Sequence, residues 1–186
     1  QFEAMGTDKI IVSTRKPPTS GKDVSDSSGN SMMERYGITV ADLDHISKMD
    51  NVEEGSVARN SRKKILSGMK RLDLALVGVS IDFLEFSRSR LVQGRWLSPI
   101  DGITNNCVIG ANVKRQLFSI GEKNVVGSTI MVERDIFRIV GIVENLHGTH
   151  IPGIGSPNDC IFITIMASDS IFGKKAYETS NRNPTV

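Results

Sequence analysis

The stretch Leu72-Asp-Leu-Ala-Leu-Val-Gly-Val-Ser-Ile81 decides the fold of this chain. Leucines occupy every second position from Leu72 to Leu76, and this period of two is typical of a β-strand with one buried face. Residues 77–81 are apolar at positions facing both sides, so we expect this end of the strand to be more deeply buried. Ser67-Gly68 is a turn signal between this strand and residues 52–66, which together predict a β-hairpin.

Further short apolar runs, separated by turn residues, predict more strands downstream. The predicted strands lie at 91–92, 106–110, 128–133, 136–144 and 160–166. A single helical turn is predicted at 81–86. Residues 111–118 form an amphipathic helix in this interpretation, with Val113, Leu117 and Phe118 directed inward and Gly121 as its stop signal.

A second clear helix is predicted at residues 39–49. Thr39 and Asp42 fit a capping box, which satisfies free amide groups at a helix start. Apolar residues then recur at a spacing of three, at Val40, Leu43, Ile46 and Met49. Strands dominate, two helices are clear, and the two kinds of element do not alternate regularly, so the sequence predicts an α+β fold with mixed strands.

Two polar stretches rich in Gly, Pro and Ser predict mobile loops, at residues 13–31 and 147–159. The domain prediction follows from them. Residues 1–60 form a first-lobe segment, residues 61–166 a strand-rich second lobe, and residues 167–186 a polar tail or linker without periodicity.

Composition excludes several classes of function. The 186 residues are 39% hydrophobic, which is enough for a core, whereas a net charge of +2 and 5% aromatic residues argue against a dedicated nucleic-acid binder. No apolar run approaches the roughly 20 residues of a membrane span. The chain begins with Gln1, and we expect it to be a piece of a longer protein.

The sequence predicts no catalytic, cofactor-binding or metal-binding residues. No phosphate-binding glycine loop and no G-x-S-x-G elbow is present. His147 and His150 could share a metal with Asp159 nearby, but a tight zinc site needs three or four ligands held rigidly, so we favour a solvated loop.

Two further features leave alternatives open. Cys107 and Cys160 lie in separate apolar strands and are compatible with a disulfide or with two buried free thiols. A basic run crosses the predicted hairpin and could bind an anionic partner, such as a membrane surface or nucleic acid. Because no aromatic residue interleaves with it, we favour a solvated hairpin tip whose charges block edge aggregation. The run comprises Arg59, Arg62, Lys63, Lys64, Lys70 and Arg71.

An ordered series of short segments carries a family resemblance. The segments are Gln1-Phe-Glu-Ala-Met-Gly-Thr7, Ile10-Ile-Val12, Gly78-Val-Ser-Ile-Asp-Phe83, Leu91-Val-Gln-Gly-Arg-Trp96, Cys107-Val-Ile-Gly110, Arg115-Gln-Leu-Phe118, Val126-Gly127 and Phe137-Arg-Ile-Val-Gly-Ile-Val143. In this order they resemble the MacB-like periplasmic core domain of ABC-transporter permeases in the MacB/FtsX-like superfamily. The glycines at 78, 94, 110 and 141 fit tight turns or close backbone approach.

The resemblance implies a two-lobed extracytoplasmic domain that is not itself an enzyme. It implies ATP hydrolysis on a separate cytoplasmic domain, and transmembrane helices that flank the domain, anchor it on the periplasmic or extracellular face of the cell membrane and transmit motion to it. A homodimeric transporter and a membrane-fusion or lipoprotein partner are further implications. Family members complete the first lobe with a returning βα segment. No clear one follows Met166, so we expect one incomplete lobe.

Two other hypotheses remain from the residues. The first is a free-standing secreted or periplasmic α+β binding module that uses the loops at 13–31 and 147–159. The second is a small hydrolase with an unrecognised site.

Overall fold

The computed structural model describes residues 10–13, 38, 40–52, 55–102, 104–119, 121–122 and 124–172. The chain divides into two compact units. Unit 1 comprises Gln1–Ile10 and Ser56–Lys175, and unit 2 comprises Ile11–Gly55 and Ala176–Val186. The predicted lobe boundary at residue 60 lies inside the first strand of unit 1, which begins at Ala58.

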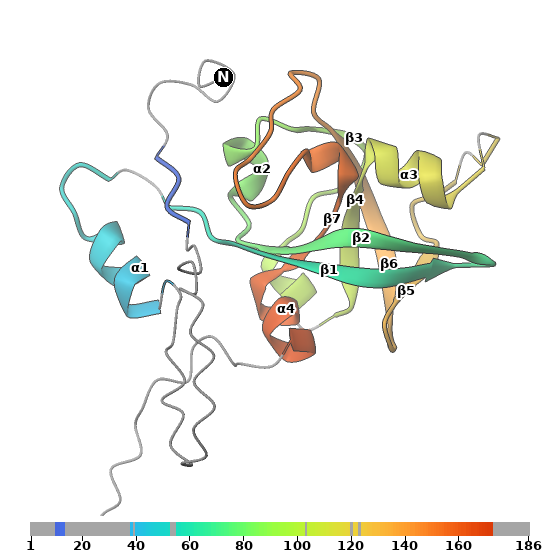
Figure 1. Cartoon of the computed structure of the whole chain (residues 1–186), viewed down its shortest axis with the longest axis horizontal. Coiled ribbons are helices and arrows are strands. Elements are labelled where there is room, and N and C mark those ends of the chain that lie inside the picture. Colours follow the sequence, from blue (N-terminus) through green and yellow to red (C-terminus); the bar gives the residue numbers. More distant parts are fainter. Residues whose placement is uncertain are drawn as a thin grey trace, which may run out of the picture. The chain divides into compact units, whose positions relative to one another are not determined.

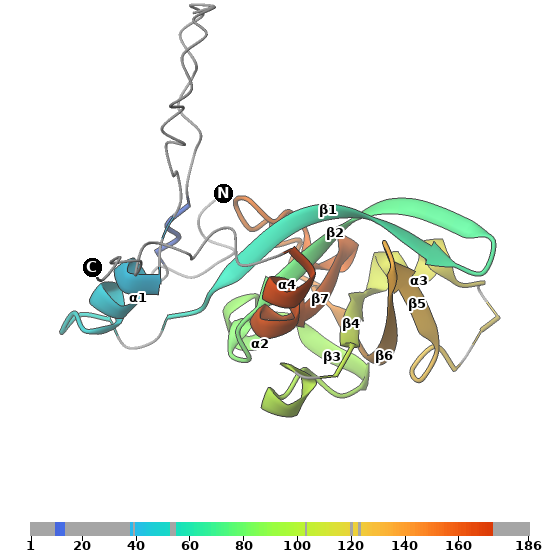
Figure 2. The same ribbon diagram turned by 90° about the horizontal axis from the view of Figure 1, so that it is seen from below.

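Unit 1 is built on one mixed sheet that closes on itself (Figures 1 and 2). The strand order is β3-β6-β4-β7-β2-β1-β5, and β5 also pairs with β6. Six strands therefore form a closed ring, and β3 lies on the part of β6 that β5 leaves unpaired. The strands are β1 (Ala58–Ser67), β2 (Lys70–Val79), β3 (Arg90–Gly94), β4 (Asn106–Gly110), β5 (Thr129–Val132), β6 (Asp135–Glu144) and β7 (Cys160–Thr164).

The predicted hairpin is confirmed as β1 and β2, which pair in antiparallel register from Ala58↔Val79 to Ser67↔Lys70. The turn lies one residue later than predicted, at Gly68 and Met69, and Gly68 has the positive φ of 57° that such tight turns favour. The alternation in β2 also ends as predicted, because Leu76 to Val79 are all buried.

The interior of the ring is apolar. It contains residues from all six strands of the ring, closed off by Val113 and Leu117 of α3 (Ala111–Leu117) and Ala167 of α4 (Ile165–Phe172). Burying one such aliphatic side chain contributes roughly 2 kcal/mol. The inward direction of Val113, Leu117 and Phe118 is confirmed, although α3 ends at Leu117, one residue before the predicted end, because Phe118 has extended backbone.

A second apolar cluster lies on the outer face of the ring. Phe162 of β7 contacts Phe83 of α2 (Phe83–Phe86) and Trp96, with ring centroids 5.7 and 5.6 Å apart. The predicted helical turn at 81–86 is thereby confirmed as α2. The two clusters together bury β7 on both faces, which explains why all five of its residues are buried.

Two helix predictions need correction. The predicted tail is wrong for residues 167–172, because α4 covers Ile165–Phe172 and the preceding strand ends at Thr164. Polar residues such as Ser168 led to the prediction of a polar tail. In the structure Ser168 is fully buried against β2. In unit 2, α1 spans Val40–Ser47, and Met49 follows the helix and is exposed instead of continuing its apolar stripe.

Other predictions lie partly or wholly outside the described residues. The capping position Thr39 and nearly all of the predicted loop at 13–31 are among them. None of the helices in the described part of the chain has the length and apolarity that a membrane crossing needs.

Candidate functional site

A dense polar cluster of unit 1 lies where the chain leaves the sheet after β3. Gly94 ends β3 with a φ of 74°, and a Cβ atom added there would collide with the backbone oxygen of Val140. A Cβ atom added at Gly141 would collide with the backbone oxygen of Arg95. The chain therefore crosses β6 at direct backbone contact, as predicted for these two glycines.

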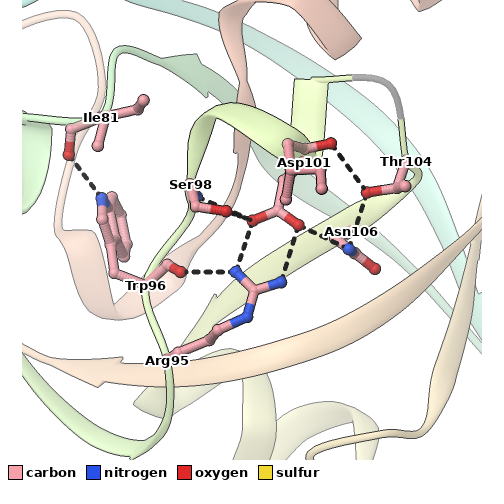
Figure 3. A network of polar contacts seen from close by, with 8 residues as sticks. Ile81, Arg95, Trp96, Ser98, Asp101, Thr104 and Asn106 are labelled. Carbon is pink, nitrogen blue, oxygen red and sulfur yellow. Dashed lines mark hydrogen bonds and ion pairs between the residues drawn. The ribbon is translucent and has the colours of Figure 1, made fainter.

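Arg95 emerges from this crossing and meets Asp101 in the short helix η2 (Pro99–Gly102) (Figure 3). Its Nη1 and Nη2 donate to the two carboxylate oxygens of Asp101 at 2.6 and 2.9 Å. Ser98 donates to Asp101 from its backbone N at 2.8 Å and from its hydroxyl at 3.0 Å, and Asn106 Nδ2 donates at 2.7 Å. Five donors thus surround a carboxylate that is fully buried.

These donors determine the chemistry that Asp101 can perform. The hydrogen bond from Arg95 is the main cause that holds the pKa of Asp101 far below its usual value, against the opposing effect of burial. The same bond raises the pKa of Arg95. A carboxylate with both oxygens occupied and so low a pKa is a poor general base near neutral pH. The cluster instead fixes the path of the chain from β3 to β4.

Trp96 extends this cluster to the outer apolar face. Its indole Nε1 donates to the backbone oxygen of Ile81 at 2.7 Å, and its ring lies against Phe162. Figure 3 shows Trp96 and Arg95 leaving the same segment in different directions. Through these contacts the Gly94-Arg95-Trp96 segment, which follows β3, is held to Ile81 just after β2 and to η2.

Arg95 stands in one of the segments that carry the family resemblance, whereas its partner Asp101 was not predicted. A local signal was present, because Ser98-Pro-Ile-Asp101 has the spacing of a capping box at the start of a helical turn. In the structure Asp101 indeed accepts from the backbone N of Ser98.

A second polar anchor, also missed, fixes the segment that follows β6. Asn145 is buried and donates through Nδ2 to the backbone oxygen of Ser87 at 2.9 Å, while its Oδ1 accepts from the backbone N of Thr149. Asn158, in η3 (Pro157–Asp159), exchanges two hydrogen bonds with the backbone of Asn145, at 2.8 and 2.9 Å. The predicted loop at 147–159 is thus tied together at both ends, and its mobility stays a prediction.

The histidine pair is exposed on this segment. His147 and His150 are both at the surface, and the described residues contain no group of three His, Cys, Asp or Glu side chains placed to hold a metal. Asp159 accepts instead from Asn112 Nδ2 at 2.8 Å.

The two cysteines are free thiols, which decides between the alternatives left open. Strands β4 and β7 are neighbours, but their register pairs Val108 with Phe162 and offsets Cys107 from Cys160 by three positions. Three residues of strand correspond to about 10 Å, too far for a disulfide. Burial raises the pKa of Cys107 and raises that of Cys160 to about 12, so neither is a reactive thiolate.

The basic run is divided between engaged and outward-facing residues. Arg59 Nη1 lies 3.1 Å from Asp169 Oδ1 of α4, and Lys63 Nζ lies 3.7 Å from Glu133 Oε1. Arg62 and Lys64 alternate with them and face solvent. Arg62 also lines an open groove of about 350 Å³ beside Asp73, Gln116 and Asp159.

Comparison with protein families gives one match over nearly the whole chain. A family model described as "MacB-like periplasmic core domain" matches residues 1–181. Two curated relatives are both named "Macrolide export ATP-binding/permease protein MacB". The protein from Pasteurella multocida (strain Pm70) is 31% identical over 75 residues, which are 40% of this chain and 12% of that protein. The protein from Chlorobium phaeobacteroides is 30% identical over 105 residues, 55% of this chain and 15% of that protein.

Solved structures share the fold at low sequence identity. The periplasmic region of MacB from Actinobacillus actinomycetemcomitans matches with a TM-score of 0.60 and 19% identity, over 74% of this chain and 60% of that one. The extracellular domain of the noncanonic ABC-type transporter YknZ from Gram-positive bacteria matches with a TM-score of 0.59 and 14% identity, over 73% of this chain and 67% of that one. The chain thus corresponds to a small part of its curated relatives and to most of an extracytoplasmic domain.

Proposed function

Because the chain belongs to the MacB-like periplasmic core domain family, we propose that it transmits an ATP-driven conformational change on the outer side of a membrane. The family match confirms the resemblance inferred from the sequence, and the similar solved structures confirm the α+β fold. The chain is a MacB-like periplasmic domain of an ABC-transporter permease, and its position is extracytoplasmic. Force transmission is our proposal for what this domain does.

One observation carries the proposal: two of the elements next to which the chain passes between the units, β1 and α4, are in contact. The entering strand β1 and the leaving helix α4 are joined by the Arg59–Asp169 ion pair at 3.1 Å. Just before β1, Ser56 Oγ lies 2.9 Å from Ser80 Oγ at the end of β2. A unit that is pulled at two elements in contact with each other follows their motion as one body, which is what a relay requires.

The interior of unit 1 supports the same conclusion. A closed ring has no internal edge along which strands can slide, and close-packed interiors transmit strain with little compression. The carboxylate of Asp101 is saturated with hydrogen bonds and both thiols are buried, so these three groups are used by the fold. The family is that of a permease domain which is not itself catalytic.

The remaining parts of a transporter are proposed from the relatives. Their name combines ATP binding with permease function, and this chain matches only 12% and 15% of their length. We place ATP hydrolysis on a separate cytoplasmic domain or subunit, and anchoring on transmembrane helices that flank this segment. A homodimeric transporter and a membrane-fusion or lipoprotein partner complete the proposal.

The test measures motion within the full transporter. Met69 in unit 1 and Met49 in unit 2 are both exposed, so Met69→Cys and Met49→Cys accept a pair of spin labels while the native thiols stay protected. The distance between the labels should change between the ADP and ATP states. A transporter carrying a hydrolysis-deficient ATPase is the control, and it should stop at the ATP-bound distance.

An unchanged distance in all nucleotide states would overturn the relay. The free-standing binding module is the second candidate, and the open groove beside Arg62 and Asp73 is the observation in its favour. A gene with an upstream signal peptide and no apolar spans after this segment would select that candidate.

A further inference from the structure

The positive charge of the chain is concentrated in one place. Residues 62–71, which we call the cationic tip, contain five basic and no acidic residues. The other 176 residues contain 18 basic and 21 acidic ones, so the chain outside the tip carries a net negative charge. Segregated charge of this kind creates a local field that attracts oppositely charged partners.

The geometry of the hairpin leaves three of these charges directed outward. Lys64 lies opposite Asp73 and Arg71 opposite Leu66, so both basic residues share the outer face of the hairpin with Arg62. All three are exposed, and the structure gives them no ion pair with any described residue. Because their charges are not neutralised by a neighbour within 4 Å, they remain available to a partner.

The neighbouring helix enlarges the surface. Lys70 Nζ donates to the backbone oxygen of Gln116 in α3 at 2.9 Å, which brings the tip beside the last turn of that helix. Lys114 and Arg115 belong to the same turn. Met69 is fully exposed at the turn between the two strands and adds an apolar contact surrounded by positive charge.

The position of the tip favours a protein over a lipid surface. Ten register pairs separate the Ala58 end of the hairpin from its turn, a distance of about 30 Å. Two of the connections of unit 1, those next to β1 and α4, lie at the Ala58 end, where Arg59 meets Asp169 (Figure 1). This step rests on the proposed function: if the membrane is reached through these connections, the tip at the far end of the hairpin points away from it.

We propose that the cationic tip docks onto an acidic surface of an extracytoplasmic partner protein. Its exposed arginine and lysine side chains pair with carboxylates, and Met69 packs between them. Such pairing sets the rate of encounter and the choice of partner more than it sets the final affinity.

The competing explanation is that the charges only protect the open edge of β2, where Lys70 to Leu74 have no partner strand beyond β1 among the described residues. The two explanations differ in how they depend on the sign of the charge. Edge protection works with charge of either sign, whereas docking on an acidic surface needs positive charge.

The experiment uses the full chain and a labelled oligoglutamate peptide, with fluorescence anisotropy as the readout. We expect binding that weakens as salt rises, and Lys64→Glu with Arg71→Glu should weaken it by about tenfold. Lys48→Glu in unit 2 is the matched control for one exposed lysine, and it should leave the affinity unchanged.

Vesicles of phosphatidylcholine with phosphatidylglycerol form the second arm. Tighter binding to these vesicles than to the peptide would overturn the proposal in favour of a membrane surface. Equal binding of the peptide by the wild type and the Lys64→Glu/Arg71→Glu variant would leave edge protection as the explanation. Neither assay contains ATP or a transporter, so the result is independent of the relay test.

Discussion

Two groups of charged residues in unit 1 differ in their burial and in their ion pairing. Asp101 is fully buried and receives five hydrogen bonds, two of them from Arg95. Lys64 and Arg71 in the cationic tip are exposed and belong to no ion pair among the described residues. The charge of the first group is neutralised inside the fold, whereas the charges of the second group are exposed to solvent.

Two further ion pairs fall between these extremes. The side chains of Arg59 and Asp169 are 23% and 30% exposed, and those of Lys63 and Glu133 are 24% and 46% exposed at a longer distance. Because water screens exposed pairs, the contribution of each pair to stability should fall in the order of these exposures. The four predictions below test that order from its strongest member to its weakest.

Asp101→Ala should produce the largest loss of stability. The substitution leaves the backbone N of Ser98 without its side-chain acceptor, removes one of the two bonds that Asn106 Nδ2 donates, and removes both bonds from Arg95 to the carboxylate. We expect the free energy of unfolding to fall by about 3 kcal/mol in urea denaturation. Asp82→Ala is the control, because Asp82 is exposed and its side chain makes no capping bond. Equal losses for the two variants would show that burial does not distinguish these carboxylates.

The contribution of Asp101 should also depend on pH. Its pKa in the folded chain lies well below the ordinary 3.8, so its stabilisation is complete above 3.8 and is lost as pH falls through the folded pKa. The gap in unfolding free energy between the wild type and Asp101→Asn should be constant from neutral pH to about pH 5 and then narrow. Urea titrations at successive pH values measure it, and a gap that widens on acidification would contradict the assignment.

Local patterns explain which parts of this fold were predictable. The hairpin, β4 and α3 follow from period-two or helical spacing within about ten residues, and each was placed nearly correctly. The closure of the ring depends on Ile65 meeting Val132, two residues far apart in sequence with no local signal of pairing. Helix α4 packs against β2 through the contact between Ser168 and Gly78, two residues far apart in sequence with no local signal of contact.

Only some members of the polar clusters could be predicted from the sequence, because the contacts that form the clusters depend on the tertiary structure. Arg95 stands in a recognisable segment, whereas Asp101 is identified as its partner only by the path of the chain over β6 after β3 ends. Asn145 and Asn158 looked like ordinary loop residues, although the side chain of Asn158 satisfies the backbone of Asn145, and that of Asn145 satisfies the backbone of Ser87 and Thr149. Burial, which decides the role of a polar residue, is a property of the tertiary structure.

Arg59→Ala and Asp169→Ala should have intermediate effects. Each should lower the free energy of unfolding by about 1 kcal/mol, and the double variant should show a coupling of roughly 0.5 kcal/mol between them. The same cycle at Lys63 and Glu133, whose atoms are 3.7 Å apart, is the comparison and should show less coupling. Stronger coupling at Lys63–Glu133 would reverse the order that burial predicts. Hydrogen exchange should also report earlier opening of α4 in Arg59→Ala, because the ion pair joins α4 to β1.

The smallest effect on stability is expected at the cationic tip. Lys64→Gln and Arg71→Gln should each change the free energy of unfolding by less than about 0.5 kcal/mol, since both side chains are exposed and the described residues give them no ion pair to lose. The free energy of unfolding should also rise slightly, because removing one of five like charges within residues 62–71 reduces their mutual repulsion. Thermal unfolding of the two variants at low and high salt separates these contributions: the gain should disappear when salt screens the repulsion. A clear loss of stability at both salt concentrations would mean that these charges are part of the fold, like Asp101, and the contrast between the two groups would fail.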